Sequence, residues 1–127
     1  MYKNFFIIFW KILYIIGIYI TYMIIFWLLF AHCLGDMVFQ TEFLFKYKSS
    51  VLFCMLSHVF IWTGCIVLVL SWFGLFSYWK LIFLFLGHWA VDAWKSRQPK
   101  DLAHFRYIYY DQGLHVLQLI IVWLLRC

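Results

Sequence analysis

Four stretches of about twenty mostly apolar residues run through this chain of 127 residues. Hydrophobic side chains make up 68% of it and charged ones only 12%, whereas soluble domains average about a quarter charged residues. About 20 consecutive apolar residues are enough for a helix to cross the hydrocarbon core of a bilayer. The sequence therefore predicts an all-α membrane protein with spans at about residues 12–34, 51–72, 77–95 and 108–126.

The connections between these spans are short, and short links join antiparallel neighbours. We expect a single transmembrane domain over residues 1–127, built as an up-down four-helix bundle. Residues 1–11 form either an interfacial helix or an extension of the first span, because Lys3 and Lys11 can reach the lipid headgroups. The four cysteines show no CxxC or secreted-scaffold spacing, so no structural disulfide is expected.

Seven ionisable residues fall at one end of the predicted bundle. In an up-down arrangement, the end of the first span and the start of the second lie on the same side of the membrane. The end of the third span and the start of the fourth return to that side. These positions hold His32, Asp36, His58, His88, Asp92, Asp111 and His115. The sequence therefore predicts one polar cluster near one membrane interface.

Three of the five acidic residues have a histidine four positions away, in HCLGD, HWAVD and DQGLH. Residues four apart share a helix face, and chance would place a histidine at that spacing from a given acid about 8% of the time. In a soluble protein, a structural ion pair is the ordinary explanation. In a membrane, an ionisable group at the helix centre costs about 3 kcal/mol. Seven of them in one layer therefore favour a functional cluster.

Imidazoles and carboxylates are the usual protein ligands of Zn²⁺, Mn²⁺ and Fe²⁺, and these seven residues are enough for one or two such ions. Each is a candidate ligand or a group that orients one. A centre of this kind can activate water and clamp a phosphate ester. One of Asp36, Asp92 and Asp111 would remain as general base. The leading hypothesis is a metal-dependent hydrolase acting on a lipid-linked or small phosphorylated substrate.

Further polar residues extend the cluster towards the membrane surface. We interpret Gln40, Lys95 and Gln112 as groups that contact a bound ligand, since each lies beside or within about one turn of a cluster aspartate. The mouth also carries a positive rim of Lys46, Lys48, Lys95 and Arg97. This rim suits an anionic or phosphorylated small molecule or lipid, although ordinary snorkelling explains such residues equally well. Glu42, Asp101 and His104 lie in connections.

The sequence also contains an internal echo. AHCLGDM at 31–37 has the layout of GHWAVDA at 87–93, and SHV at 57–59 matches LHV at 114–116. This pattern indicates two repeated hairpins related by a pseudo-twofold axis along the membrane normal. In this register, Cys54 takes the place of Asp111.

Two other functions stay open. One is a metal-ion or proton transporter, because intramembrane His and Asp residues also line ion paths. A path needs polar residues that continue to the far side, whereas the rest of each span is apolar apart from lone residues such as Thr21 and Thr63. That favours a closed site. The other is a non-catalytic metal- or haem-binding accessory protein, with His58 and His115 as axial haem ligands.

The net charge of +5 does not indicate nucleic-acid binding, because the basic residues are scattered at segment ends rather than gathered on one face. We expect the bilayer to be the partner of these residues. Six lysines and arginines on the site side against four on the other favour a cytoplasmic site in the cell membrane. The sequence does not set the oligomeric state, and a homo-oligomer stays open.

The order of these motifs resembles the small bacterial membrane proteins of domain-of-unknown-function family 3307. The resemblance rests on HCLGDMVFQTEFLFKYK, the lone His58, HWAVDAWKSR and DQGLH, and it covers most of the chain from about residue 30. More distantly, the chain is similar to inner-membrane proteins described as metal-dependent hydrolases. The resemblance implies a membrane helix bundle with a polar cluster. It does not imply a particular reaction.

Overall fold

In the computed structural model, the described residues are 2–99 and 105–125, with side chains described from residue 6 onwards. The elements are α1 (Tyr2–Cys33), the π-helical segment η1 (Leu34–Val38), α2 (Glu42–Tyr47), α3 (Leu52–Trp72), α4 (Tyr78–Lys95) and α5 (Arg106–Leu124). These residues contain no strand, so the all-α prediction is confirmed. Asp101 and His104, expected in a connection, lie outside the described residues.

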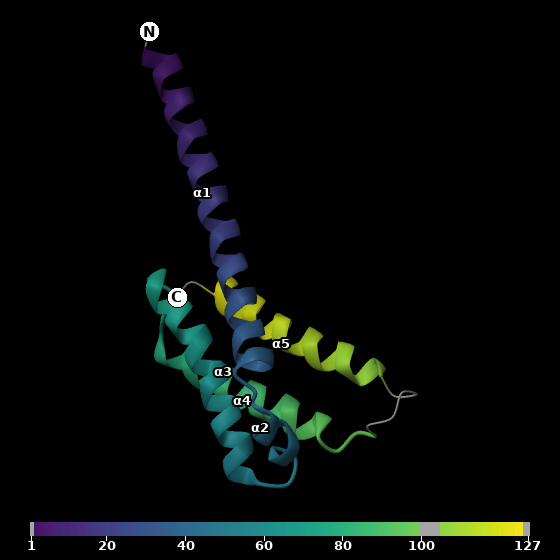
Figure 1. Cartoon of the computed structure of the whole chain (residues 1–127). Helices are drawn as coiled ribbons and strands as arrows, with labels where there is room; N and C mark the ends of the chain where they lie inside the picture. Colours follow the sequence, from purple (N-terminus) through teal and green to yellow (C-terminus); the bar gives the residue numbers. More distant parts are fainter. Residues whose placement is uncertain (1, 100–104, 126–127) are drawn as a thin grey trace.

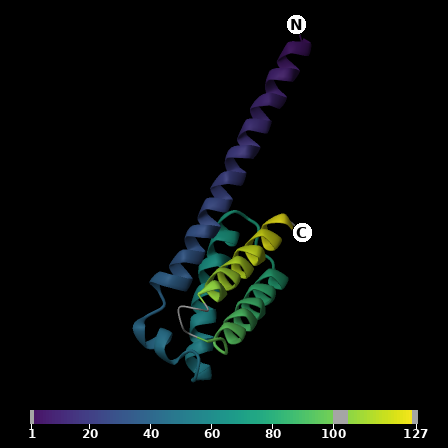
Figure 2. The ribbon, with the colours of Figure 1, turned by 90° about the vertical axis from the view of Figure 1, so that its right-hand side faces the viewer.

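α1 begins at Tyr2, so residues 2–11 extend the first span, which is one of the two expected arrangements, and η1 continues the helix at its other end. Every side chain from Phe6 to Ile20 is exposed, and the first buried one is Ile24. The N-terminal part of α1 accordingly stands clear of the other helices in both views (Figures 1 and 2). A helix that is apolar all round is suited to a lipid environment.

The later helices follow the expected boundaries closely, but one connection was assigned wrongly. The predicted ranges 51–72 and 77–95 match α3 and α4 within one residue, and α5 begins two residues before 108. The segment after the first span was expected to be only a link, and it contains the short helix α2. Thr41 caps α2 by accepting a hydrogen bond from the Leu44 amide at 3.3 Å. This cap allows six residues to form a helix.

The C-terminal part of α1 packs against α3 and α5, α3 packs against α4, and α4 packs against α5. Figure 2 shows these four segments side by side. They enclose an apolar core made of Ile24, Leu28, Ala31, Trp62, Ile66, Leu70, Leu84, Leu119 and Val122. The core holds the helices in the positions that bring their polar residues together.

Two helical stretches are long and apolar enough to cross a membrane by length and composition. They are Phe6–Val38, with mean hydropathy 2.3, and Leu52–Trp72, with mean hydropathy 2.2. No other helix in the described part of the chain meets the same measure. α4 and α5 fall short because they hold six of the ten buried polar or charged side chains. Two of the four expected spans are therefore supported on this measure.

Gly35 allows η1 to lie directly against α3. A Cβ atom at this position would come within 2.8 Å of the Trp62 Cα atom and 3.1 Å of its Cδ1 atom. The first of these neighbours is backbone, which cannot rotate away. Any larger residue therefore forces η1 and α3 apart, and Asp36, the next residue, moves with η1.

We expect Gly35→Ala to lower the free energy of unfolding by about 1–3 kcal/mol, the usual range for overpacking. Gly64→Ala is the matched control, because Gly64 lies within α3 and nothing stands within 4 Å of its Cβ position. That change should be neutral or stabilising by up to about 1 kcal/mol, since alanine favours helix. Thermal unfolding of both variants in the same detergent measures the difference. Equal melting temperatures would contradict the close approach.

Candidate metal centre

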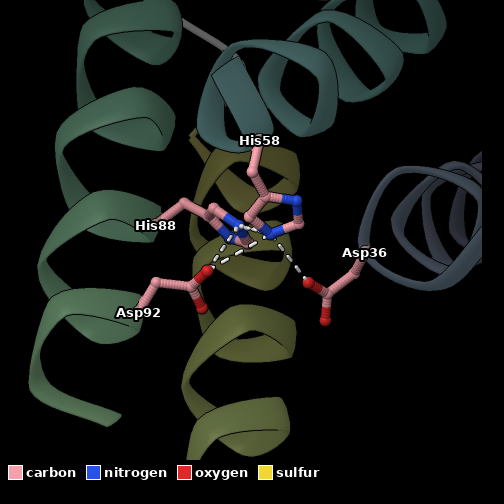
Figure 3. Close-up of side chains that lie close together, drawn as sticks. All are labelled: Asp36, His58, His88 and Asp92. Carbon is pink, nitrogen blue, oxygen red and sulfur yellow. Dashed lines mark hydrogen bonds and ion pairs between the residues drawn. The ribbon is translucent and has the colours of Figure 1, made fainter. Parts of the chain in front are cut away.

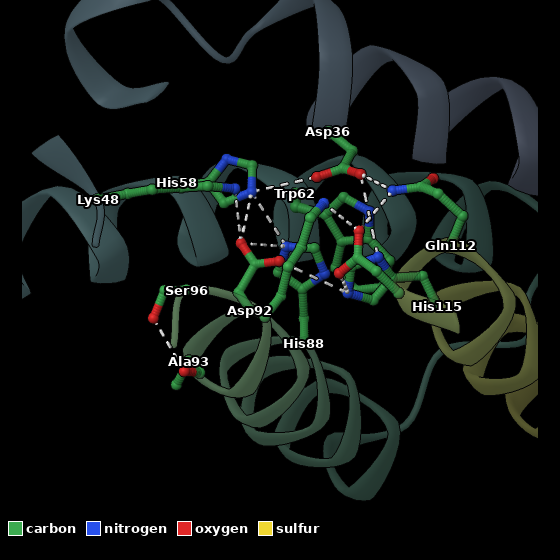
Figure 4. A network of polar contacts seen from close by, with 12 residues as sticks. Asp36, Lys48, His58, Trp62, His88, Asp92, Ala93, Ser96, Gln112 and His115 are labelled. Carbon is green, nitrogen blue, oxygen red and sulfur yellow. Dashed lines mark hydrogen bonds and ion pairs between the residues drawn. The ribbon is translucent and has the colours of Figure 1, made fainter. Parts of the chain in front are cut away.

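Each of the four packed helical segments brings ionisable side chains to one end of the molecule. The structure brings together all seven residues that the sequence singled out, and we call them the His/Asp cluster: His32, Asp36, His58, His88, Asp92, Asp111 and His115. All seven are buried, and Asp36 is the most exposed at 8%. Figure 4 shows the polar contacts that join their helices.

Four atoms of this cluster have the spacing of metal ligands. The Nε2 atom of His58 lies 3.2 Å from Asp36 Oδ1, 3.2 Å from Asp92 Oδ2 and 3.2 Å from His88 Nε2. His88 Nε2 lies 3.8 Å from Asp92 Oδ2. Ligand atoms at about 2.0 Å from a tetrahedral ion are about 3.3 Å from one another. We call Asp36, His58, His88 and Asp92 the four-residue set, and Figure 3 shows their side chains converging.

Asp36 reaches this point from a π-helical turn. The Phe39 amide donates to the Leu34 carbonyl oxygen at 2.8 Å, five residues back rather than four. The turn leaves Asp36 close to His32, and these two residues and His115 offer ligand atoms that lie within 4.8 Å of one another. π-helical turns of this kind occur often at functional sites.

His32 has both ring nitrogens engaged. The Trp62 indole N–H donates to its Nδ1 atom at 2.9 Å, and its Nε2 atom lies 2.9 Å from the Gln112 Oε1 atom. Because an indole N–H can only donate, Nδ1 is the acceptor and Nε2 carries the hydrogen. The Gln112 amide in turn donates to Asp36 Oδ2 at 2.7 Å and to Asp111 Oδ2 at 3.0 Å. His32 thus fixes the Gln112 amide by a hydrogen bond, and that amide donates to the carboxylates of Asp36 and Asp111.

A second group of ligand atoms surrounds His115. Its Nε2 atom lies 3.9 Å from Asp92 Oδ1 and 4.0 Å from Asp111 Oδ1. We call Asp92, Asp111 and His115 the three-residue set. Asp92 belongs to both sets, and it turns Oδ2 to the first and Oδ1 to the second. A carboxylate placed in this way could bridge two ions.

Several buried atoms of the two sets lack hydrogen-bond partners among the described residues. They are Asp92 Oδ1, Asp111 Oδ1, both ring nitrogens of His115, and the Nδ1 atoms of His58 and His88. A buried polar atom left unpaired is costly and calls for an explanation such as an ion or water. The unpaired carboxylate oxygens and one ring nitrogen of a neutral His115 are ligand atoms that divalent transition metals accept, so these residues fit a metal.

Two lysines neutralise two of the three buried carboxylates. Lys48 Nζ donates to Asp92 Oδ2 at 2.9 Å, and Lys95 donates to Asp111. Asp36 has no lysine partner among the described residues, and its carboxylate contacts Gln112, His58 and, at 3.9 Å, His115. Three carboxylates against two ammonium groups leave one formal negative charge when the imidazoles are neutral, which favours a cation.

The three residues expected to contact a ligand also have partners within the protein. Lys95 and Gln112 both bind Asp111. Gln40, in the amide orientation that pairs both of its groups, donates to the Asp36 carbonyl oxygen at 3.2 Å and accepts from Lys48 at 2.6 Å. Lys95 and Gln112 therefore help to hold a carboxylate in place, whereas Gln40 holds Lys48, which binds Asp92.

Sequence reasoning did not identify the contribution of Trp62 to the cluster. Its ring stacks on His88 with centroids 4.1 Å apart, and its N–H binds His32. Trp62 lies four residues after His58 and therefore on the same helix face, which was the available signal. Lys48 was assigned only to the rim, although it reaches Asp92. Its link to the cluster spans 44 residues of sequence and has no local pattern.

Comparison with known proteins points to one family. No curated protein and no solved structure matches the chain. The family model described as a protein of unknown function, DUF3307, matches residues 24–127. The match begins at Ile24, the first buried residue of α1, and includes the whole His/Asp cluster. The resemblance seen in the motifs is thereby confirmed, and the chain belongs to the DUF3307 family.

Proposed function

We propose that this protein is an integral membrane protein with a centre for one or two divalent transition-metal ions, which hydrolyses a lipid-linked or small phosphorylated substrate. The observation that carries the proposal is the four-residue set, whose ligand atoms lie within 4.8 Å of one another, with three of them at 3.2 Å from His58 Nε2, close to the separation around a tetrahedral ion. The second carboxylate oxygen of Asp92 faces His115 and Asp111, which supports a second ion.

The residues divide into ligands and supporting groups. Asp36, His58, His88 and Asp92 would hold the first ion, and Asp111 and His115 would join Asp92 around a second. The donors suit Zn²⁺, Mn²⁺ or Fe²⁺, and an ion bound here would lower the pKa of a water molecule and polarise a phosphoryl oxygen. With one ion bound, Asp111 remains available as general base. His32 would orient Asp36 and Asp111 through Gln112.

We further propose that α1, α3, α4 and α5 all cross the membrane as an up-down bundle. The polar groups of α4 and α5 are turned inwards: Lys80, His88, Asp92, Asp111 and His115 are at most 2% exposed. Exposed positions of the same helices include Ile82, Leu86, Leu117 and Ile120. Polar residues that face the bundle interior are the usual arrangement within membranes. The positive residues at the site end favour its placement on the cytoplasmic side.

We expect purified protein to contain one or two transition-metal ions per chain, and His88→Ala and Asp92→Asn to lose most of them. Each change removes a ligand atom of the four-residue set. Glu42→Gln is the matched control, because Glu42 is an exposed acid outside the cluster and its loss should leave the metal content unchanged. Elemental mass spectrometry measures this. A folded wild-type protein that takes up no Zn²⁺, Mn²⁺ or Fe²⁺ would overturn the proposal.

The indole N–H of Trp62 gives a second test of the same centre. Trp62→Phe keeps a ring to stack on His88 but removes the donor to His32. We expect metal affinity to fall by about 10–100-fold, as is usual when a group that orients a ligand is lost. A competition titration with a fluorescent chelator measures the affinity. Unchanged affinity would show that His32 does not support the ligands.

A transporter is the second candidate, because α5 continues the polar row inwards from His115 to Gln118. Gln118 is 7% exposed, and its Oε1 atom has no partner among the described residues. The surrounding core of nine apolar residues favours a closed site. We expect Gln118→Leu to keep the metal content, because its amide belongs to neither set of ligands. In reconstituted vesicles, metal or proton flux that this change abolishes would support transport over hydrolysis.

The stacking of the imidazoles favours an ion over haem. The ring centroids of His88 and His115 are 4.2 Å apart, and those of His58 and His88 are 5.1 Å apart. Rings packed on one another in this way leave no flat slot for a porphyrin between them. The haem hypothesis for His58 and His115 would need the cluster to open.

A further inference from the structure

A cavity of about 350 Å³ lies beside the His/Asp cluster, outside the two sets of ligands. It is formed by the turn between α2 and α3, the start of α3 and the last turns of α4 with the residues that follow. Its lining includes Lys48, Ser50, Leu52, Trp89, Ser96 and Arg97. We propose that this cavity, the headgroup pocket, binds the phosphate group of an anionic membrane lipid.

The polar part of the headgroup pocket is built for an anion. Two cationic side chains line it, and no carboxylate does. Lys48 is already bound to Asp92, whereas the exposed Arg97 guanidinium makes no ion pair among the described residues. A guanidinium with free N–H groups can bind two phosphate oxygens at once.

Hydroxyl and amide groups add to this positive surface. Ser50 donates to the Tyr47 carbonyl oxygen at 3.3 Å and Ser96 donates to that of Ala93 at 2.9 Å. Either hydroxyl can rotate towards a ligand. α3 begins at the pocket with Val51 as its N-cap, which offers no side-chain acceptor, and its first turn contains no acid. Its free amide groups support the binding of an anion beside the arginine.

The opposite wall is apolar and leads towards the lipid-facing surface. Leu52 is 62% exposed and Trp89 is 38% exposed, so both line the pocket and also face outwards. A free phosphate ion gains nothing from this wall, whereas a phospholipid would lay the start of its acyl chains along it. The volume lies near the lower limit for small-molecule sites, which suits a headgroup with its tails outside.

Lys48 joins the headgroup pocket to the His/Asp cluster. Its ammonium group lies 2.9 Å from Asp92 Oδ2, and its side chain also lines the pocket. Figure 4 shows the side chain of Lys48, the residue after α2, reaching towards Asp92. A phosphate held here would lie next to the four-residue set. That this lipid is also the substrate rests on the proposed function, whereas its binding does not require a metal.

The test measures lipid binding by native mass spectrometry of the detergent-purified full chain, with phosphatidate and phosphatidylcholine as probes. We expect wild type to prefer phosphatidate, and Arg97→Gln to lose about tenfold in affinity for it, the effect of removing charge-assisted hydrogen bonds. Arg106→Gln is the matched control, because Arg106 is exposed at the start of α5 outside the pocket and should bind as wild type does.

Equal affinity for the two lipids, or equal losses in the two variants, would overturn the proposal. Inorganic phosphate is added as a competitor, and displacement of phosphatidate by millimolar phosphate would assign the pocket to free phosphate rather than to a lipid. Metal content measured on the same samples separates the two proposals. Selective lipid binding without metal would support the headgroup pocket and overturn the proposed hydrolase. Metal without selective lipid binding would overturn the pocket and leave the proposed metal centre supported.

Discussion

Three carboxylates buried at one end of an apolar bundle determine how the rest of that end is built. A charge taken out of water is costly unless it is paired or hydrogen-bonded. Asp92 forms an ion pair with Lys48, and Asp111 forms one with Lys95. Asp36 accepts a hydrogen bond from Gln112 and contacts His58. His58 lies in α3, Lys95 in α4 and Gln112 in α5, and Lys48 follows α2. Every packed segment is therefore joined to the others through the carboxylates.

The backbone is shaped to serve the same contacts. The π-helical turn contains Asp36, and Gly35 lets that turn approach α3 at Trp62. Trp62 then contacts His32 through its N–H and His88 through its ring face. One aromatic side chain thus orients histidines from two different helices, and a small residue at position 35 is the condition for its placement.

The features that depend on a local sequence pattern could be predicted from the sequence. Apolar runs with polar ends located α3 and α4 within one residue. The His–Asp spacing singled out six of the seven residues that meet in the structure, and the expected up-down topology added His58. The sequence did not predict α2, because a six-residue helix that depends on one threonine cap leaves little periodic signal. Nor did it predict that Lys48 reaches Asp92, because a contact between residues 44 positions apart follows from packing alone.

The two lysines neutralise carboxylates of the proposed centre when no ion is bound. Without ions, Lys48 and Lys95 supply the positive charge that Asp92 and Asp111 need, so the bundle can hold its ligands in place. Lys48 binds Asp92 Oδ2, which is also the oxygen nearest His58, so an ion held by the four-residue set would compete with Lys48 for Asp92. The ammonium group displaced from Asp92 would still line the headgroup pocket. Metal loading would thereby increase the positive charge offered to a phosphate there, which couples the two sites through one side chain.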